Sequence, residues 1–584
     1  MNRMQREKEQ HALEQLQRGH LEDAEAIYRT LMEEGATSYT IFYNLAVICG
    51  MQGRKQEMIP LLRKAITINP NDPEVYNNLG VALKDKGDLQ AAIDSYRQSL
   101  AIKSHSPQVY SNLGNALKEQ GNLQAAIDAY RQALAISSNS SQVYFNLGNA
   151  LKEQGNFQAA IDAYRQALVI NPNLLKVYSN LGNALKDQGD PQAAIDAYHQ
   201  ALAINPNSPE VYNNLGNALK KQDDFQAAIN AYRQALDIKP DYAEAYTNLG
   251  IALIEQGDLQ AAVDAYRQVL AIQPHSPKAY FNLGMALKSQ GDLQAAIDAY
   301  RQALAINPND PQAYNNLGIA LKGQGNLQAA IDAYRQALAI KPHYPEVYNN
   351  LGNALKDQGD LKVAIDAYRQ ALAINSDYPA AHCNLSLVQL LLSDYESGWK
   401  EYEWRFQVKG NPQPHAHPQV ERWNGSNLAP GENLILVSEQ GLGDTLQFMR
   451  YVLYLNNIGI SAALCAKTKL HSLIRASEIT TMIYSPEQVN QRTTGKWLPL
   501  LSLPGYLQVR PDHPIVNPPY IKAPEQQVDH WRQKLATEQR PIVGINWSGT
   551  RRPAPSGKTE DWRSLPLEAF APIVEKTTVT LLSL

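Results

Sequence analysis

The apolar and polar positions of the chain repeat every 34 residues over most of its length. Within one period, apolar residues from Tyr76 to Leu83 recur at helical spacing, Gly87 interrupts the pattern, and the apolar pattern resumes at Ala92 and Tyr96. The period therefore predicts two helices joined by a turn, with one apolar face left for the next unit to cover.

The period and the pattern Tyr-x2-Leu-Gly-x2-Leu, then Ala-x3-Tyr, then Pro, resemble the tetratricopeptide repeat, with Tyr where Trp or Phe is usual. Near-identical units run from residue 73 to residue 378, a looser unit occupies 39–72, and degenerate units precede and follow them. The resemblance implies an all-α superhelix of about 11 to 12 repeats over residues 1–406. Asp223 replaces the glycine of one turn, where we expect a small local strain.

One polar residue follows the same period, an asparagine two residues after the first tyrosine of each unit. Its side chain offers one acceptor and two donors, so it can pair with the backbone of an extended peptide without reading the peptide's side chains. The row resembles the asparagine ladder of O-GlcNAc transferases, which implies a position on the groove side of the repeats. We call these residues the ladder: Asn44, Asn78, Asn112, Asn146, Asn180, Asn214, Asn248, Asn282, Asn316, Asn350 and Asn384.

A second interpretation is that the ladder asparagines bond to neighbouring repeats and to water, and were copied along by duplication. A partial second asparagine row, one helical turn further on, favours peptide binding; it consists of Asn115, Asn149, Asn183, Asn217 and Asn353. A lysine row has acidic neighbours and is predicted to be a solvated face; it consists of Lys84, Lys118, Lys152, Lys186, Lys220, Lys288, Lys322 and Lys356.

The amino-acid composition argues against nucleic acid, membranes and metal ions as partners. Lys plus Arg number 53 against 57 for Asp plus Glu, so the chain lacks the cationic excess that nucleic acid or an anionic membrane selects. The three cysteines lie far apart, which predicts a reducing compartment, and no apolar run reaches the ~18 residues of a membrane span. His415 and His417 have no further ligand candidates nearby, so no metal site is expected. These features predict a soluble, cytoplasmic protein.

Beyond residue 406 the period stops. Residues 407–433 are rich in Pro, Gly and Asn and are predicted to be a linker. From residue 434, short apolar runs alternate with helical patterns, which predicts an α/β domain with a mainly parallel sheet. The expected strands are 434–438, 462–466 and 480–484, and the expected helices are 445–455 and 470–476.

The first of these strands runs into a Gly-x-Gly-Asp turn, which places Asp444 at the carboxyl end of the sheet, where ligands bind in open α/β folds. Segments 398–406, 422–425, 439–451, 499–504, 543–549 and 563–566 resemble, in this order, a bacterial family of tetratricopeptide proteins whose C-terminal domain is similar to heptosyltransferases, a two-lobed GT-B class. The resemblance implies that Asp444 is a general base that takes the proton of an acceptor hydroxyl. The alternative is that Asp444 only caps the following helix.

The resemblance also implies an acceptor half at 434–540 and a donor half that begins at 541, where Lys558 and Arg563 would neutralise the phosphates of a nucleotide sugar. Residues 541–584 are too few to complete a doubly wound half, and they end inside an apolar run. We therefore expect an incomplete GT-B-like domain, either a fragment of a longer protein or a truncated domain that has lost its donor site.

Two main functional hypotheses follow, beside a third in which the chain is a pure scaffold and its α/β domain is vestigial and binds no nucleotide sugar. The first is a scaffold that binds client polypeptides in the groove of its repeats and carries a partial glycosyltransferase-like domain. The second is an active protein O-glycosyltransferase, in which the groove presents a polypeptide to Asp444 and a nucleotide sugar is the donor substrate. Apart from that donor, no cofactor is expected.

Overall fold

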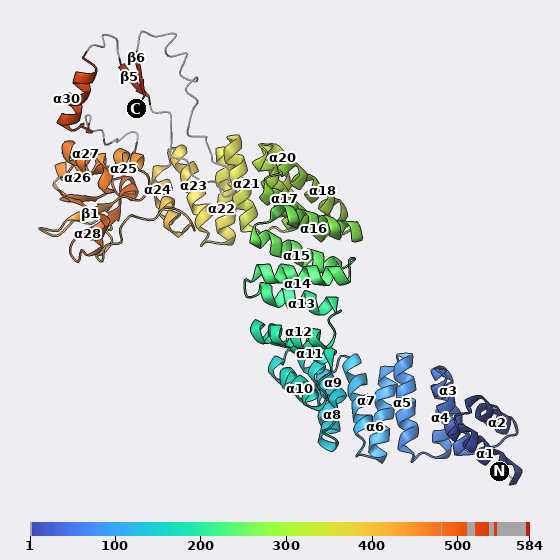
Figure 1. Ribbon diagram of the computed structural model, residues 1–584. Helices are drawn as coiled ribbons and strands as arrows, with labels where there is room; N and C mark the ends of the chain where they lie inside the picture. Colours follow the sequence, from blue (N-terminus) through green and yellow to red (C-terminus); the bar gives the residue numbers. More distant parts are fainter. Residues whose placement is uncertain are drawn as a thin grey trace. The chain divides into compact units, whose positions relative to one another are not determined.

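The structure is a computed structural model that describes residues 3–480, 482–510, 515, 520–536, 542–545 and 580–583. Contacts divide the chain into two compact units, Met1–Ile272 and Gln273–Leu584. Both units are built mainly from helices that follow one another in packed pairs (Figure 1).

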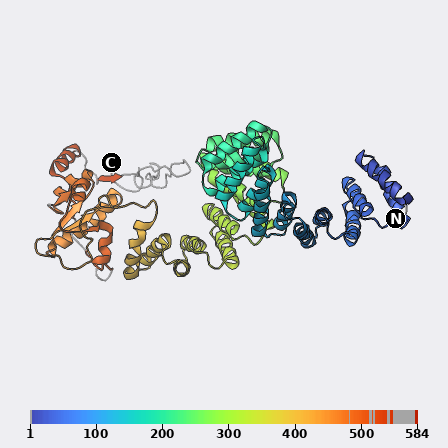
Figure 2. The same ribbon diagram turned by 90° about the horizontal axis from the view of Figure 1, so that it is seen from below.

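The first unit contains eight helix pairs among its described residues, and neighbouring pairs pack side by side, as the view from below also shows (Figure 2). Its helices are α1 (Arg3–Gln17), α2 (Leu21–Glu33), α3 (Tyr39–Met51), α4 (Lys55–Ile68), α5 (Pro73–Lys86), α6 (Leu89–Ile102), α7 (Pro107–Glu119), α8 (Leu123–Ile136), α9 (Ser141–Glu153), α10 (Phe157–Ile170), α11 (Leu175–Gln188), α12 (Pro191–Ile204), α13 (Pro209–Lys220), α14 (Phe225–Ile238), α15 (Ala243–Gln256) and α16 (Leu259–Ile272).

The second unit begins with four further helix pairs of the same kind. They are α17 (Pro277–Gln290), α18 (Leu293–Ile306), α19 (Pro311–Gly323), α20 (Leu327–Ile340), α21 (Pro345–Gln358), α22 (Leu361–Ile374), α23 (Pro379–Leu391) and α24 (Tyr395–Tyr402), and the 3₁₀ helix η1 (Glu403–Gln407) follows.

Local sequence explains where these helices start and stop. Asn156 caps α10 by accepting a hydrogen bond from the backbone N–H of Ala159, and proline is the first residue of helices such as α5. Gly155 has a φ of +86°, which favours glycine and ends the preceding helix. Asp223 takes a φ of +60° at the same point of its repeat, which confirms the expected strain.

The core of the near-identical repeats is a tyrosine ring packed on a glycine. Tyr164 is completely buried, and a Cβ atom added to Gly148 would lie only 2.5 Å from the tyrosine's Cε1 atom. Glycine is therefore required there so that the ring can reach the helix backbone. The pair recurs through both units, as Gly182 with Tyr198 and Gly284 with Tyr300, so the paired helices approach each other closely at these glycines.

Beyond η1, the second unit contains a four-stranded parallel sheet with the strand order β3-β2-β1-β4. We call its strands and the helices that follow them, through residue 510, the α/β part. The elements are β1 (Leu434–Val437), α25 (Leu442–Phe448), α26 (Arg450–Asn457), β2 (Ala462–Cys465), η2 (Thr468–Leu470), α27 (His471–Ala476), β3 (Ile483–Tyr484), α28 (Pro486–Asn490), β4 (Lys496–Pro499), η3 (Leu500–Ser502) and α29 (Leu503–Tyr506). Further along the chain lie α30 (Glu525–Lys534) and a separate parallel pair, β5 (Ile542–Ile545) and β6 (Thr580–Ser583).

The predicted strands at 434–438 and 462–466 are confirmed as β1 and β2, and the parallel sheet is confirmed as well. The helix expected at 445–455 is instead two short helices, and β4 was not predicted. Residues 407–433, predicted as a linker, lie against the sheet, because Trp423 is buried and its backbone N–H donates to the carbonyl of Trp497 at 2.8 Å. The described strands are few and short, so they do not define the two-lobed GT-B class.

Candidate functional site

The eleven ladder asparagines all lie on the first helix of a pair, and each is half-buried. A half-buried amide has room to bond within the protein and still to meet a ligand. The ladder reaches a cavity at Asn78. This cavity has a volume of about 250 Å³ and is also lined by Glu74, Asn77 and Gln108.

Most ladder amides donate a hydrogen bond to the preceding repeat. Where an asparagine stands just before the preceding ladder residue, its Oδ1 atom accepts the bond. These pairs are Asn112 with Asn77 at 3.0 Å, Asn248 with Asn213 at 2.9 Å, Asn350 with Asn315 at 3.0 Å and Asn384 with Asn349 at 2.9 Å.

In two repeats, where Ser111 or Phe145 stands at that position, the second asparagine row provides the acceptor. Asn146 donates to Asn115 at 3.0 Å, and Asn180 donates to Asn149 at 2.8 Å. The interpretation that the ladder bonds to neighbouring repeats is thus confirmed for these residues. Each such bond uses one N–H of the ladder amide. The second N–H and the lone pairs of the amide oxygen that are not already used stay available for a ligand.

The second asparagine row has an internal role that the sequence did not predict. Its Oδ1 atoms accept hydrogen bonds from the buried tyrosine hydroxyls of the same repeat, so the row satisfies polar groups of the core. The pairs are Tyr130 with Asn115, Tyr164 with Asn149, Tyr198 with Asn183, Tyr232 with Asn217 and Tyr368 with Asn353, at 2.7–2.8 Å.

Five ladder residues do not donate a hydrogen bond to another of the described asparagines. Asn44 donates to the Tyr28 hydroxyl, Asn78 lies 3.5 Å from the Tyr43 hydroxyl, and Asn316 bonds to Lys288 and to the carbonyl of Gln312. Among the described residues, Asn214 and Asn282 have no side-chain hydrogen-bond partner. These two amides are therefore the ladder members whose full bonding capacity is available.

Tyr300 shows what happens where the second row is interrupted. Met285 stands at the position of Asn149, and the buried hydroxyl of Tyr300 has no hydrogen-bond partner among the described residues. We expect Tyr300→Phe to leave stability unchanged or to raise it, and Tyr164→Phe to lower it by about 1 kcal/mol, because only the second change removes a hydrogen bond. Hydrogen exchange of α18 and α10 measures both effects, and equal losses would contradict this account.

The lysine row is half-buried, which corrects the expectation of a solvated face. Burial lowers the pKa of Lys220 and of Lys288. The expected acidic neighbours are present in part, since Lys84 pairs with Glu119 at 2.9 Å and Lys322 pairs with Asp357 at 2.8 Å.

Asp444 lies at the start of α25, just beyond the carboxyl end of β1, as the sequence predicts. Its carboxylate accepts a hydrogen bond from the backbone N–H of Gly441 at 3.0 Å and so forms part of a helix cap. Asp444 therefore caps α25. Its role as a general base, and the alternative that it does nothing but cap, stay predictions. Lys558 and Arg563 lie outside the described residues.

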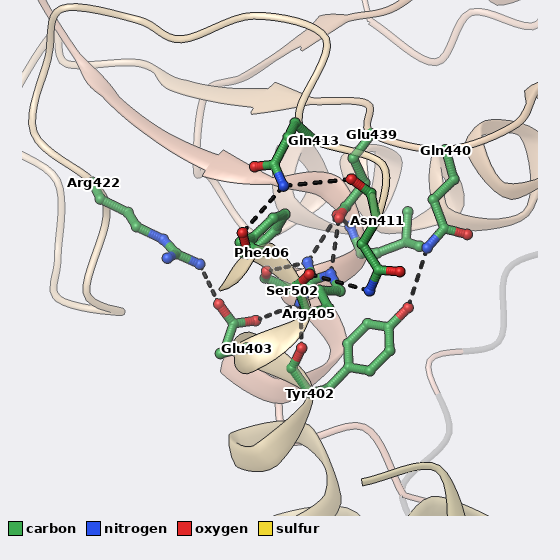
Figure 3. A network of polar contacts seen from close by, with 11 residues as sticks. Tyr402, Glu403, Arg405, Phe406, Asn411, Gln413, Arg422, Glu439, Gln440 and Ser502 are labelled. Carbon is green, nitrogen blue, oxygen red and sulfur yellow. Dashed lines mark hydrogen bonds and ion pairs between the residues drawn. The ribbon is translucent and has the colours of Figure 1, made fainter. Parts of the chain in front are cut away.

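Sequence reasoning missed a buried ion pair that joins the end of the repeats to the α/β part (Figure 3). Arg405, on η1, donates from Nε and Nη2 to both carboxylate oxygens of Glu439 at 2.8 and 2.9 Å, and the two side chains are 4% and 0% exposed. Arg405 also donates to the Ser502 hydroxyl, and Glu439 accepts the backbone N–H of Leu501.

The surroundings of this pair keep it charged. Burial by itself would lower the pKa of Arg405, but the hydrogen bonds and negative charge of Glu439 leave that pKa above its ordinary value. The guanidinium also lies between the rings of Tyr402 and Phe406, 4.3 and 4.0 Å from their centroids. One signal was visible in the sequence, because Glu439 is a charged residue almost directly after the apolar run 434–437.

A cavity of about 580 Å³ lies beside this network, between α24 and the segment after α29. Trp399, Trp404 and Tyr506 contribute aromatic rings to its wall, and Lys400 and Arg510 contribute charges. Within the described part of the chain, no group of three or more His, Cys, Asp or Glu side chains could hold a metal ion, and no helix is long and apolar enough to cross a bilayer. His415 instead bonds to Ser438, at 2.8 Å.

The fold and these rows define a helical repeat protein, and comparison with known families gives the particular class. Family models described as TPR repeat match 82–121, 114–155, 148–189 and 182–223, and two tetratricopeptide repeat models match 10–73 and 61–94. A model for the C-terminal domain of cilia and flagella-associated protein 70 matches 207–403. The chain belongs to the tetratricopeptide-repeat proteins. Its repeats support the interpretation that it is a protein-interaction scaffold.

Solved structures of repeat proteins are also similar to the chain. A crystal structure of MamA is 31% identical, with a TM-score of 0.27, and the match covers 28% of this chain and 95% of that one. The C-terminal part of a TPR protein from Cytophaga hutchinsonii is 20% identical, with a TM-score of 0.37 and coverages of 41% and 98%. YrrB, described as a TPR protein with an unusual peptide-binding site, is 22% identical, with a TM-score of 0.30 and coverages of 32% and 95%. The comparison with curated proteins returned no match.

Proposed function

We propose that the repeats bind extended polypeptides and that the ladder holds the bound backbone. The observation that carries this proposal is the recurrence of one half-buried amide at the same place in eleven repeats. Two of these amides, Asn214 and Asn282, have no side-chain hydrogen-bond partner among the residues that the structure describes. An amide that pairs with both the N–H and the C=O of a peptide tolerates many peptide sequences.

The spacing of the repeats fits this ligand. Packed helices lie ~10 Å apart and an extended chain rises ~3.3 Å per residue, so one ladder amide would meet about every third residue of a bound strand. A compact folded domain cannot offer its backbone in this way. The expected clients are therefore unfolded segments, tails or loops of other proteins.

The sharpest test replaces the two ladder residues that make no internal bond. We expect the double variant Asn214→Ala, Asn282→Ala to bind peptides about tenfold more weakly, because it loses peptide bonds worth ~0.5–1.5 kcal/mol each and no bond of the fold. The probes are fluorescein-labelled dodecapeptides selected on the wild-type chain from a phage-displayed random library, and fluorescence anisotropy measures their dissociation constants.

The matched control removes two amides elsewhere. Gln154 and Gln188 are exposed and donate to glutamines of the preceding repeat at 3.0 and 2.7 Å, so Gln154→Ala, Gln188→Ala deletes as many amide groups away from the ladder. Unchanged affinity in the ladder variant, or an equal loss in the glutamine variant, would sink the proposal.

Sugar transfer at Asp444 is the second candidate, supported by the position of this carboxylate at the carboxyl end of a parallel sheet. Asn in place of Asp444 keeps an oxygen that accepts the Gly441 N–H but cannot take a proton. With UDP-N-acetylglucosamine as donor and a selected peptide that contains Ser as acceptor, we expect the wild-type chain to produce glycopeptide detectable by mass spectrometry and Asp444→Asn to produce none. Equal product from both proteins, or none from the wild type, would remove this candidate.

A further inference from the structure

Apolar residues stand in place of the second asparagine row in both units, at Val81 and Ile251 in the first and at Met285 and Ile319 in the second. Phe281 stands just before Asn282, and Met285 stands three residues after it, the two positions that hold amide acceptors beside other ladder residues. Ile319 repeats the second change in α19. All three side chains are half-buried, so part of each meets solvent. We call Phe281, Met285 and Ile319 the apolar step.

The contacts around the apolar step show the consequence of this change. Asn316 lacks an amide acceptor in the preceding repeat, and its own amide turns instead to the carbonyl of Gln312 at 3.0 Å. The hydroxyl of Tyr300 is buried and has no hydrogen-bond partner in the part of the chain that the structure describes. An asparagine at position 285 would satisfy both groups, as Asn115 does for Tyr130 and Asn146. Stability of the fold therefore does not account for Met285, whereas a role at the surface does.

The charge beside the apolar step lacks the carboxylate that two other repeats place near it. Lys84 and Lys322 pair with a carboxylate 35 residues further on, but that position relative to Lys288 is Gly323. Lys288 donates to the Oδ1 atom of Asn316 at 2.9 Å and has no carboxylate partner among the described residues. An ammonium group beside apolar side chains is complemented by a ligand that carries both an apolar group and a carboxylate.

We propose that the apolar step is a specificity subsite that holds a bulky apolar side chain of a bound polypeptide while Lys288 meets an acidic residue next to it. Met285 and Lys288 are three residues apart on one helix, ~5 Å along its axis, which one or two residues of an extended chain span. The preferred client segment thus has Leu, Ile, Met or Phe within two residues of Asp or Glu. This inference rests on the proposed function, because the ladder must first hold the backbone.

The test compares peptide selection on three full-length proteins: the wild type, the double variant Met285→Asn, Ile319→Asn, and the control Val81→Asn. The control makes the same change in the same row, in α5 of the first unit. Random dodecapeptides displayed on phage are selected on each protein, and the enriched peptides are then synthesised and titrated by fluorescence anisotropy. Hydrogen exchange of α18 checks that the double variant is folded, and it should be slower or unchanged because Tyr300 gains an acceptor.

We expect wild-type selections to be enriched in the apolar–acidic pair, and we expect those peptides to bind the double variant about tenfold more weakly and Val81→Asn equally well. Enrichment of unrelated sequences, or equal affinity for the double variant, would overturn the subsite while leaving the scaffold intact. If no peptide is selected, or if Asn214→Ala, Asn282→Ala binds as well as the wild type, the proposed function fails and the subsite fails with it.

Discussion

Replacing Arg405 with methionine is expected to destabilise the α/β part by about 3–5 kcal/mol, because the change leaves the carboxylate of Glu439 buried without its partner. Methionine fills a similar volume, so the loss arises from the charge and its hydrogen bonds. Those bonds reach Glu439, Ser502 and the carbonyl of Tyr402, which belong to different elements of the second unit. We therefore expect η1 and the α/β part to lose structure together.

The chain offers a direct readout of this effect. Its seven tryptophans all follow residue 398, so their fluorescence reports only the end of the repeats and the regions beyond them, whereas far-ultraviolet circular dichroism reports mainly the repeat helices. In urea, Arg405→Met should move the fluorescence transition to lower concentration and leave most of the dichroism transition in place.

Two controls separate the buried pair from general effects of substitution. Arg422→Met removes a guanidinium that is 40% exposed and pairs with Glu403, and it should change stability by less than about 1 kcal/mol. The double variant Arg405→Met, Glu439→Leu removes both charges and should recover much of the loss, since no charge is then left unpaired. A fluorescence transition unmoved by Arg405→Met would show that the pair does not hold the α/β part.

The repeats could be predicted from the sequence because their contacts are local. Each helix packs against the next one along the chain, so the 34-residue period carries both the elements and their neighbours. The sequence also determines the partners of two ladder residues, although we did not predict them. Asn112 bonds to Asn77, 35 residues earlier, whereas Asn146 bonds to Asn115, 31 residues earlier. The partner depends on which of the two positions holds an asparagine.

The α/β part could be predicted only in outline. Alternating apolar runs indicated β1 and β2, but β4 pairs with β1 across a long stretch of chain, and its residues carry no periodic signal. The bond between Arg405 and Glu439 is equally non-local. Asp444 was placed at the correct edge of the sheet, and what its carboxylate does beyond capping α25 depends on chemistry that no spacing encodes.

Gly148→Ala is expected to destabilise its repeat by about 1–3 kcal/mol, because the added methyl group would lie 2.5–3.0 Å from three carbon atoms of the Tyr164 ring. The ring is completely buried, and its hydroxyl is held by Asn149 at 2.8 Å, so it has little room to move away. Hydrogen exchange of α9 and α10 should accelerate, while helices several repeats away keep their protection because each repeat contacts only its neighbours.

A matched glycine in the same repeat distinguishes this clash from a change in backbone freedom. Gly155→Ala adds a methyl group with no atom within 4 Å, and its cost of about 1–2 kcal/mol comes only from the positive φ. The double variant Gly148→Ala, Tyr164→Leu should then recover stability, since Ala46 and Leu62 occupy these two positions in an earlier repeat, and both are completely buried there. Recovery in this double variant, and none in Gly155→Ala, Tyr164→Leu, would show that the fit between ring and glycine sets the spacing of the paired helices.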